Sequence, residues 1–421
     1  MKKTHIGIIG AMACLMAACS PASQKGKSEG QIEILPAFEN QTELKISHLG
    51  KNIRYVPLET TDSSLIGNGC KVKLLDDKIM VTYGMRGESH CFLFDKETGK
   101  FIREVGHKGN DPRGYSEPKA YVHPVTGNIY FHRVPNKLIK YSQEGTFLGE
   151  VEMPNGLPSG FYPLLTKNGM LVYEGETFNA QHQSKLYYWD EEKGKTGDIA
   201  LPEVVNSENI DPSGIHSISV LAGGVEVYGL LQQNGAIKIE FKDETQGLFM
   251  YNYPALWAIG DDFHFHETFG DTIYQVKDHE LEPYRIFDLG ERHLPKAERG
   301  KKEGNEEKLT IVYVLETPDL IYFQCAKNLY NDCTMYNGLY RKSDETVMMN
   351  LTKEGFTDDL TGFAPFHPIS STKKGGFIGV LKIEDIQEWL EEHPEVKLEG
   401  TLAPLKDLAD DANPVVVIVE P

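Results

Sequence analysis

Two histidines in one short segment are the first residues whose spacing could support chemistry. His264 and His266 alternate with Phe263 and Phe265, so a strand through this segment would direct both imidazoles to the same side of a sheet. Two imidazoles at that spacing can bind one metal ion, such as zinc, if a third ligand comes from elsewhere in the chain. Glu267 would point to the opposite side. The pair is therefore a weak metal candidate that also fits a purely structural role in a strand.

Acidic pairs offer a second kind of site, because calcium binds several oxygen ligands at once. Three such pairs occur, at Asp261-Asp262, Asp358-Asp359 and Asp410-Asp411. None of them lies in a recognisable calcium-binding loop, and short acidic side chains commonly bind backbone groups in turns. Asp271 and Thr272 fit the same turn role. No cofactor is predicted from these residues, and calcium or zinc is kept only as an alternative.

The chain contains six cysteines. Cys14 would be lost with the leader segment discussed below and Cys19 would carry a lipid. Four others would then lie in an oxidising compartment: Cys70, Cys91, Cys325 and Cys333. Cys325 and Cys333 flank a hairpin-like loop and could form a disulfide across two strands. Buried free thiols are the alternative, because cysteine packs well as a small hydrophobic residue.

Common enzyme signatures are absent from the sequence, including Gly-x-Ser-x-Gly, a phosphate-binding loop, His-Glu-x-x-His and Cys-x-x-Cys. No catalytic residue is therefore assigned. The chain has 62 Asp and Glu against 43 Lys and Arg, a net charge of −19. This balance disfavours nucleic acid as a partner, because its binding requires a basic surface. The same balance would favour a cationic ligand.

These residues lie in a series of repeats of short strands. In the clearest repeat, residues 71–118, four short segments rich in apolar residues are separated by turns, at 71–75, 78–83, 91–94 and 101–105. Four antiparallel strands cannot bury both faces of their sheet alone. A loop rich in Gly and Pro follows at 106–115 and leads to the next unit. This arrangement is typical of one blade of a β-propeller.

Five similar units follow, at residues 120–158, 162–201, 217–249, 256–289 and 308–351. Recurrence at about 40 to 50 residues is the period of propeller repeats. The sequence therefore predicts an all-β fold, a six-bladed β-propeller of four-stranded antiparallel blades, with a short C-terminal helix at 383–392. Strand-like segments at 53–58 and 414–419 are expected to close the ring without adding a blade.

The N-terminal residues have the features of a lipoprotein signal peptide. Two lysines precede a short apolar stretch that ends in small residues directly before Cys19. We expect cleavage of residues 1–18 and lipidation of Cys19, which would attach the protein to a membrane surface. An ordinary secretory signal, in which Cys19 plays no part, is the alternative. Residues 19–43 are expected to form a flexible tether, and residues 44–421 the propeller domain.

Four motifs give the sequence a resemblance to a known family. They are YVPLET at 55–60, the loop at 109–115, FHFHETFGDTIY at 263–274 and NPVVV at 413–417. Over essentially its full length the chain resembles the six-bladed β-propeller lipoproteins of Bacteroidetes. The loop departs from the commoner Gly-Pro-Gly-Glu form, because it reads DPRG at 111–114. The resemblance implies the fold but no catalytic residues, since most members are uncharacterised.

Together these features predict a binding module rather than an enzyme. We expect a monomer anchored by its N-terminal lipid to the outer membrane, on the periplasmic or surface side, that binds a peptide, a glycan or an envelope protein. A rigid ring presents its loops well for such binding. The alternative is a metal-dependent propeller enzyme, similar to lactonases or lyases. In that case His264 and His266 would meet acidic residues of other blades in the axial channel.

Overall fold

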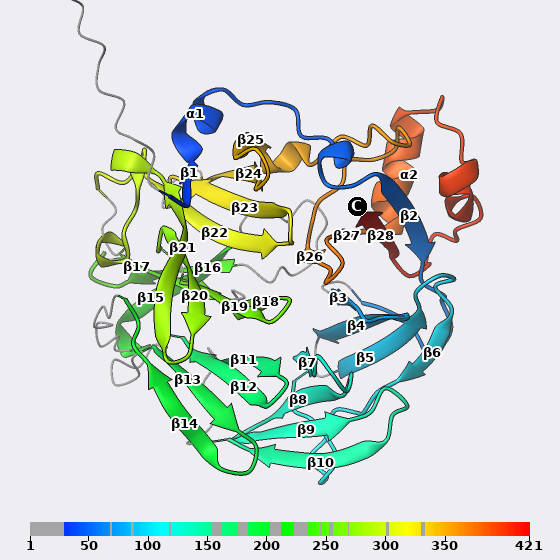
Figure 1. Ribbon diagram of the computed structural model, residues 1–421. Helices are drawn as coiled ribbons and strands as arrows, with labels where there is room; N and C mark the ends of the chain where they lie inside the picture. The colour runs from blue at the N-terminus through cyan, green and yellow to red at the C-terminus, as the bar shows by residue number, and fades with distance from the viewer. Residues whose placement is uncertain are drawn as a thin grey trace, which may run out of the picture.

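The computed structural model describes residues 29–421, apart from 68–69, 86–87, 118, 154–160, 176–183, 203–211, 223–234, 245, 252–255, 268, 300–302 and 330–332. The described strands form seven small sheets arranged in a ring (Figure 1). In most sheets the first strand along the chain lies nearest the ring axis and the later strands lie further out, but the N-terminal strands of the last sheet and of the fifth sheet lie at the outer edge. The fold is therefore a β-propeller, whose blades surround a central channel.

The sheets are numbered in chain order. Sheet 1 contains β3 (Lys71–Leu74), β4 (Lys78–Met85), β5 (Glu88–Asp95) and β6 (Phe101–Glu104), and sheet 2 contains β7 (Ala120–Val122), β8 (Ile129–Arg133), β9 (Lys137–Tyr141) and β10 (Phe147–Glu152). Sheet 3 contains β11 (Phe161–Thr166), β12 (Gly169–Glu174), β13 (Lys185–Asp190) and β14 (Gly194–Ile199), and sheet 4 contains β15 (Ile215–Ala222), β16 (Gly235–Phe241) and β17 (Gln246–Tyr251).

Sheet 5 contains β18 (Leu256–Ile259), β19 (Asp262–His266), β20 (Thr272–Lys277) and β21 (Glu280–Asp288), with β1 (Gln31–Glu33) at its outer edge. Sheet 6 contains β22 (Leu309–Glu316), β23 (Leu320–Lys327), β24 (Thr334–Arg341) and β25 (Thr346–Leu351). Sheet 7 contains β26 (Ser370–Ser371), β27 (Phe377–Leu381), β28 (Val415–Glu420) and β2 (Asn52–Pro57). Among these strands, β1 and β21 are the one parallel pair.

Local sequence explains the hairpins, as sheet 1 shows. Alternate residues of β4, such as Ile79, are fully buried. Asp95 ends β5 and caps the following turn, because its Oδ1 accepts a hydrogen bond from the Thr98 backbone N–H at 2.8 Å. Gly99 follows with a φ of +71°, and a Cβ added there would lie 1.9 Å from the Pro57 carbonyl oxygen. This position therefore requires glycine.

The all-β propeller expected from the sequence is confirmed, and so is the C-terminal helix α2 (Ile383–Glu392). Each of the six expected repeats forms one sheet. Sheet 4 has three described strands, and the strand expected at 225–228 lies outside the described residues. The structure adds one sheet to the six repeats, because the terminal strands β2 and β28 join β26 and β27 in a four-stranded sheet of their own.

Sheet 7 closes the ring by joining the two ends of the folded chain, as expected. β2 lies antiparallel to β28, with Ile53 opposite Val419. Asn413, just before β28, forms hydrogen bonds with the segment that follows β2. Its side-chain Oδ1 accepts a hydrogen bond from the Ile66 backbone N–H at 2.9 Å, and its Nδ2 donates to two backbone carbonyl oxygens at 2.8 and 2.7 Å. The first and last segments of the ring therefore hold each other in register.

The expectation of a flexible tether over residues 19–43 is wrong for its last part. β1 pairs with β21 of sheet 5, and α1 (Ile34–Glu39) follows it directly and packs against sheet 6, where Ile34 and Phe38 are buried. This segment crosses the outer edges of sheets 5 and 6 before it enters sheet 7. The folded domain thus begins near residue 31 instead of 44. Cys19 and the rest of residues 1–28 lie outside the described residues.

The alternating strand directions give the ring two unlike faces. Connections that follow the second and fourth strands of a sheet emerge on one side, called the loop face. Connections that follow the first and third strands emerge on the other side, called the turn face. The turn-face connections that the structure describes in full are short, such as 75–77 and 317–319. The loop face carries the long connections at 58–70, 105–119, 289–308, 352–369 and 382–414, the last of which includes α2.

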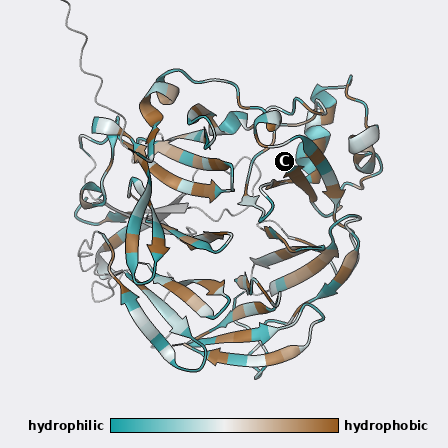
Figure 2. Cartoon of the chain, viewed as in Figure 1, coloured by the Kyte–Doolittle hydropathy of each residue, from teal (hydrophilic) through white to brown (hydrophobic). Residues whose placement is uncertain are grey.

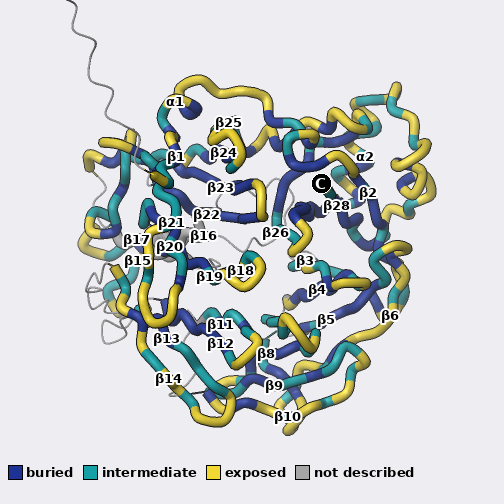
Figure 3. The backbone as a smooth tube through the Cα atoms, in the orientation of Figure 1, coloured by how far each residue is buried: buried dark blue, intermediate teal, exposed yellow. Residues whose placement is uncertain are grey.

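The hydrophobic core lies between neighbouring sheets. Figure 2 shows apolar residues along many of the strands, and Figure 3 shows that strands in the middle of a sheet, such as β8 and β23, are buried. Outer strands such as β6 and β14, the turn tips and the outer loops are largely exposed. The largest fully buried side chains are aromatic, among them Phe131, Phe265 and Phe323. Within the described parts of the chain, no helix has the length and apolar character needed to cross a bilayer.

Candidate functional site

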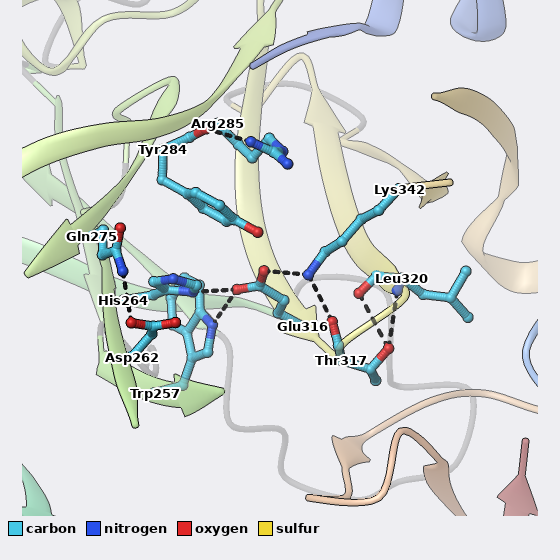
Figure 4. Close-up of polar contacts among 10 residues, drawn as sticks. All are labelled: Trp257, Asp262, His264, Gln275, Tyr284, Arg285, Glu316, Thr317, Leu320 and Lys342. Atoms are coloured by element: carbon cyan, nitrogen blue, oxygen red, sulfur yellow. Dashed lines mark hydrogen bonds and ion pairs between the residues drawn. The ribbon is translucent and has the colours of Figure 1, made fainter. Parts of the chain in front are cut away.

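A buried carboxylate lies at the junction of sheets 5 and 6 and gathers polar side chains from both (Figure 4). Glu316, the last residue of β22, has no exposed side-chain surface. Its Oε2 accepts a hydrogen bond from Trp257 Nε1 at 2.7 Å and lies 2.6 Å from His264 Nδ1. Its Oε1 lies 2.6 Å from Lys342 Nζ. We call Trp257, His264, Tyr284, Glu316 and Lys342 the Glu316 cluster.

The strand register of sheet 5 positions one half of this cluster. Trp257 on β18 lies directly opposite His264 on β19, so both side chains project from the same side of the sheet. The Tyr284 ring, from β21, stacks on the His264 ring with centroids 4.5 Å apart. Together these three side chains form an aromatic wall that faces the end of β22.

The β22–β23 turn positions the other half. Lys342 directly follows β24, and its Nζ donates to the Thr317 carbonyl oxygen at 2.7 Å as well as contacting Glu316. The Leu320 backbone N–H donates to Thr317 Oγ1 at 3.0 Å and holds the turn closed. Contacts within sheet 6 therefore hold the Glu316 carboxylate in place, and sheet 5 packs against it.

The charge state of Glu316 follows from its neighbours. Burial alone would raise its pKa, but the hydrogen bond from His264 and the positive charge of Lys342 outweigh burial and lower the pKa to about 2. The carboxylate is therefore ionised at neutral pH, and an ionised carboxylate only accepts hydrogen bonds, so His264 Nδ1 carries a proton and donates it. Burial and the nearby Glu316 charge raise the pKa of Tyr284 to about 12.

The Glu316 cluster is a joint between two sheets. Both carboxylate oxygens already accept from nitrogen donors, and the His264 side chain is 4% exposed. Protein donors thus occupy both oxygens of this ionised, buried carboxylate. Its observed role is to bind sheet 5 to sheet 6 through charge-assisted hydrogen bonds.

A similar joint lies between sheets 3 and 5. Lys296 Nζ lies 2.6 Å from Glu267 Oε1, and Tyr173 Oη, from β12, donates to the same oxygen at 3.0 Å. Both charged residues are buried. Lys296 lies in no sequence motif, and only the fold brings it to Glu267. Buried ion pairs at sheet junctions are therefore a recurring feature of this ring.

The structure places the predicted pair of histidines side by side on β19 but separates their partners. His264 contacts Glu316, whereas His266 Nε2 lies 3.1 Å from the Gly270 carbonyl oxygen. Burial lowers the pKa of His266 to about 4, so its ring is neutral at pH 7. In the described part of the chain, no group of three His, Cys, Asp or Glu side chains is placed to hold a metal ion.

The acidic pairs bind protein donors. Asp358 is buried, and its carboxylate accepts hydrogen bonds from the Tyr55 hydroxyl at 2.7 Å and from the Thr361 backbone N–H at 2.9 Å. Asp261 forms an ion pair with Lys167 across two turn-face connections. Asp410 Oδ1 accepts a hydrogen bond from Gln387 Nε2 at 2.8 Å. These three carboxylates have the turn or bridging roles that short acidic side chains commonly fill.

All four described cysteines are free thiols. The suggested disulfide between Cys325 and Cys333 is not formed, because the hairpin register offsets the two residues. Thr334, directly after Cys333, pairs with Lys327, two residues beyond Cys325. Cys325 is buried, whereas Cys333 is exposed and its Sγ lies 3.9 Å from Met335 Sδ. Burial raises the pKa of Cys325 to about 12, so this thiol is not ionised at neutral pH.

Comparison with solved structures supports the fold. A putative exported protein from Bacteroides fragilis is similar, with 15% sequence identity and a TM-score of 0.53, and the match covers 92% of this chain and 98% of that one. A member of the DUF4221 family from Bacteroides vulgatus matches with 9% identity and a TM-score of 0.46, covering 91% of this chain and 98% of that one. At such identities the similarity concerns the fold alone.

No curated protein matches the sequence at a significant level. The profile of a domain of unknown function, DUF4934, matches residues 29–420, which agrees with the start of the folded domain near residue 31. The resemblance to an uncharacterised propeller family of Bacteroidetes is thereby confirmed. The match spans nearly the whole chain, and the chain belongs to the DUF4934 family.

Proposed function

We propose that this protein is an exported propeller, anchored by a lipid on Cys19 to the cell envelope, that binds a peptide, glycan or protein partner through its loop face. The observation that carries the proposal is the exposure of large apolar side chains on that face. Leu65, Val134 and Leu360 are 53%, 56% and 38% exposed, and they belong to three different loop-face connections. Exposed apolar groups on a rigid scaffold are typical of interaction sites.

Each of these exposed side chains is held in place by hydrogen bonds close to it in the chain. Next to Leu65, the Ile66 backbone N–H donates to Asn413 Oδ1 at 2.9 Å. The Val134 backbone N–H itself donates to Ser116 Oγ at 3.0 Å. The Leu360 backbone N–H donates to Asp358 Oδ1 at 3.0 Å. Fixed loops lose little conformational entropy on binding, so this arrangement favours recognition.

Three other large apolar side chains of the described residues are exposed, at Ile102, Val125 and Leu148, and the last two provide a matched comparison. Val125 lies on the turn face and is 64% exposed, and Leu148 lies on the outer strand β10. If the loop face binds the partner, removing apolar side chains from that face will weaken binding, whereas removing Val125 and Leu148 will leave binding unchanged.

The proposal is tested by capture from envelope extracts with the purified mature chain as bait. A triple variant, Leu65→Ser, Val134→Ser and Leu360→Ser, is expected to lose the proteins or glycans that the parent enriches. The double variant Val125→Ser and Leu148→Ser is expected to retain them. Thermal melts confirm that both variants are folded. Equal enrichment by the triple variant, or no enrichment by the parent, contradicts the proposal.

The lipid anchor is tested separately. With the full-length chain expressed in a bacterial host, metabolic labelling with a fatty acid is expected to mark the parent and not the variant Cys19→Ala. The parent is expected in the membrane fraction. Labelling of the variant would contradict the assignment of Cys19 as the lipidated residue.

A further inference from the structure

A group of lysines lies on the inner strand of sheet 1 and on adjoining segments of sheets 2 and 7 in this acidic chain. Lys71 and Lys73 lie on β3, the strand of sheet 1 nearest the axis. As alternate residues of a strand they project from the same side. Lys73 pairs with Met80, which packs in the core shared by sheets 1 and 2, so this side of β3 faces sheet 2. Val72, between the lysines, is buried on the opposite side.

Two further lysines approach from the neighbouring sheets. Lys119 directly precedes β7 of sheet 2, and its positive charge acts on Lys71. Lys373 lies in the β26–β27 turn of sheet 7, where its Nζ lies 3.4 Å from the carbonyl oxygen of Pro124, in the first turn of sheet 2. The charge of Lys373 acts on Lys73. Three sheets thus contribute positive charge to one stretch of the channel wall.

The two lysines on β3 form no direct ion pair or side-chain hydrogen bond within the described part of the chain. The nearest acidic influence is Glu117, whose carboxylate lies 3.3 Å from Lys119 Nζ and whose negative charge also acts on Lys71. Lys73 keeps contact with solvent, as a residue on a channel wall does. The surrounding protein nevertheless lowers the pKa of both, that of Lys71 to about 8. Lys71 is the more enclosed of the two, and a partly buried ammonium group without a direct carboxylate partner is costly unless an anion neutralises it.

We propose that the axial channel is an anion site, in which Lys71 and Lys73 bind carboxylate, phosphate or sulfate groups of the ligand. This inference rests on the proposed binding function and names the chemistry of the ligand. The two lysines are about 7 Å apart along the strand, which suits a ligand with two anionic groups or one oxyanion between them. The chain as a whole is negatively charged, which favours a cationic ligand. The side chains that line this part of the channel are lysines, and their positive charge favours an anion.

The inference is tested with defined probes on the mature full-length domain. Glutarate, inorganic phosphate and sulfate are titrated by calorimetry, which distinguishes the carboxylate from the two oxyanion sources. Because Lys71 has an unusually large neutral fraction near pH 8, acetylation followed by mass spectrometry reports its accessibility directly. At least one probe is expected to slow acetylation of Lys71 in the parent protein.

Single substitutions test whether Lys71 and Lys73 bind the probe. Lys71→Gln and Lys73→Gln are each expected to weaken binding of that probe by about tenfold or more, as for the loss of a charge-assisted hydrogen bond. Lys353→Gln removes the same charge from an exposed surface position and is expected to bind normally. Absence of protection by all three probes, or equal weakening by Lys353→Gln, overturns the inference.

The two proposals fail in different ways. If the loop-face variants abolish capture of an envelope partner while Lys71→Gln and Lys73→Gln leave both capture and anion binding unchanged, the anion site is wrong and the loop-face function stands. If the probes bind and protect Lys71 but no partner is captured, the anion site stands and the loop-face function is wrong.

Discussion

Replacing Glu316 by Gln tests how strongly the sheet junctions stabilise the ring. The substitution keeps the size of the side chain but removes the charge that Lys342 and His264 share. It also presents an amide group to nitrogen donors, so at least one of them loses its acceptor. Removing one partner of a buried ion pair costs about 3 to 5 kcal/mol in other proteins.

The pKa of Glu316 gives an independent magnitude. Folding lowers this pKa from 4.5 to about 2, which corresponds to about 3 kcal/mol of stability at pH 7. Because the folded pKa is the lower one, this stability is fully present above pH 4.5 and is lost as the pH falls towards 2. At pH 3.5 we expect about 2 kcal/mol to remain.

Urea denaturation of the parent and of Glu316→Gln at pH 7 and pH 3.5 measures the difference in unfolding free energy. Glu282→Gln is the control, because Glu282 pairs with Lys277 on an exposed surface of sheet 5 and should cost less than about 1 kcal/mol. A loss below about 1 kcal/mol for Glu316→Gln at pH 7, or a loss that grows at pH 3.5, would refute the role assigned to Glu316.

Three further predictions concern closure, packing and pH. Deleting residues 414–421 removes β28 and should lower the melting temperature strongly, whereas deleting residues 20–28 should leave it unchanged; equal melts would contradict ring closure. Gly338→Ala should cost about 1 to 3 kcal/mol in urea denaturation, because the new Cβ would lie 2.0 Å from the ring of Phe323; a neutral substitution would show that this ring moves freely. The neutral, buried His266 has its pKa lowered from 6.5 to about 4, so the parent should lose stability as the pH falls through this window. His266→Gln should reduce that pH dependence, and an unchanged pH profile would contradict the assignment.

The sequence predicted the parts of the fold whose signals are local. Alternating apolar residues and turn residues marked each hairpin, and the amphipathic pattern after Lys382 gave α2 with the observed bounds. The β-branched run of β28 and its partner β2 identified the ring closure. The seventh sheet was not counted because β26 consists of Ser370 and Ser371 alone, which carry no apolar alternation. β1 was missed for the same reason, since its three residues, Gln31–Glu33, follow a polar segment.

The sites depended on contacts that spacing does not reveal. The alternation of His264 with His266 correctly indicated one side of a strand, but the partner of His264 is Glu316, 52 residues away. Lys342 lies 26 residues after Glu316 in the sequence. In the sequence, the two lysines of β3 form an ordinary alternation of charged and apolar residues. Their significance comes from the position of β3 beside the axis and from the approach of Lys373, which only the closed ring brings near.

Site-specific photo-crosslinking in cells tests directly whether the loop face binds an envelope partner. A photoreactive amino acid is placed at Leu65 on the loop face or at Val125 on the turn face, both of which are exposed in the folded ring. A binding surface on the loop face should give a discrete crosslinked envelope partner from position 65 and none from position 125. Crosslinking from position 125 alone, equal crosslinking from both positions, or no adduct at position 65 would contradict a binding surface on the loop face.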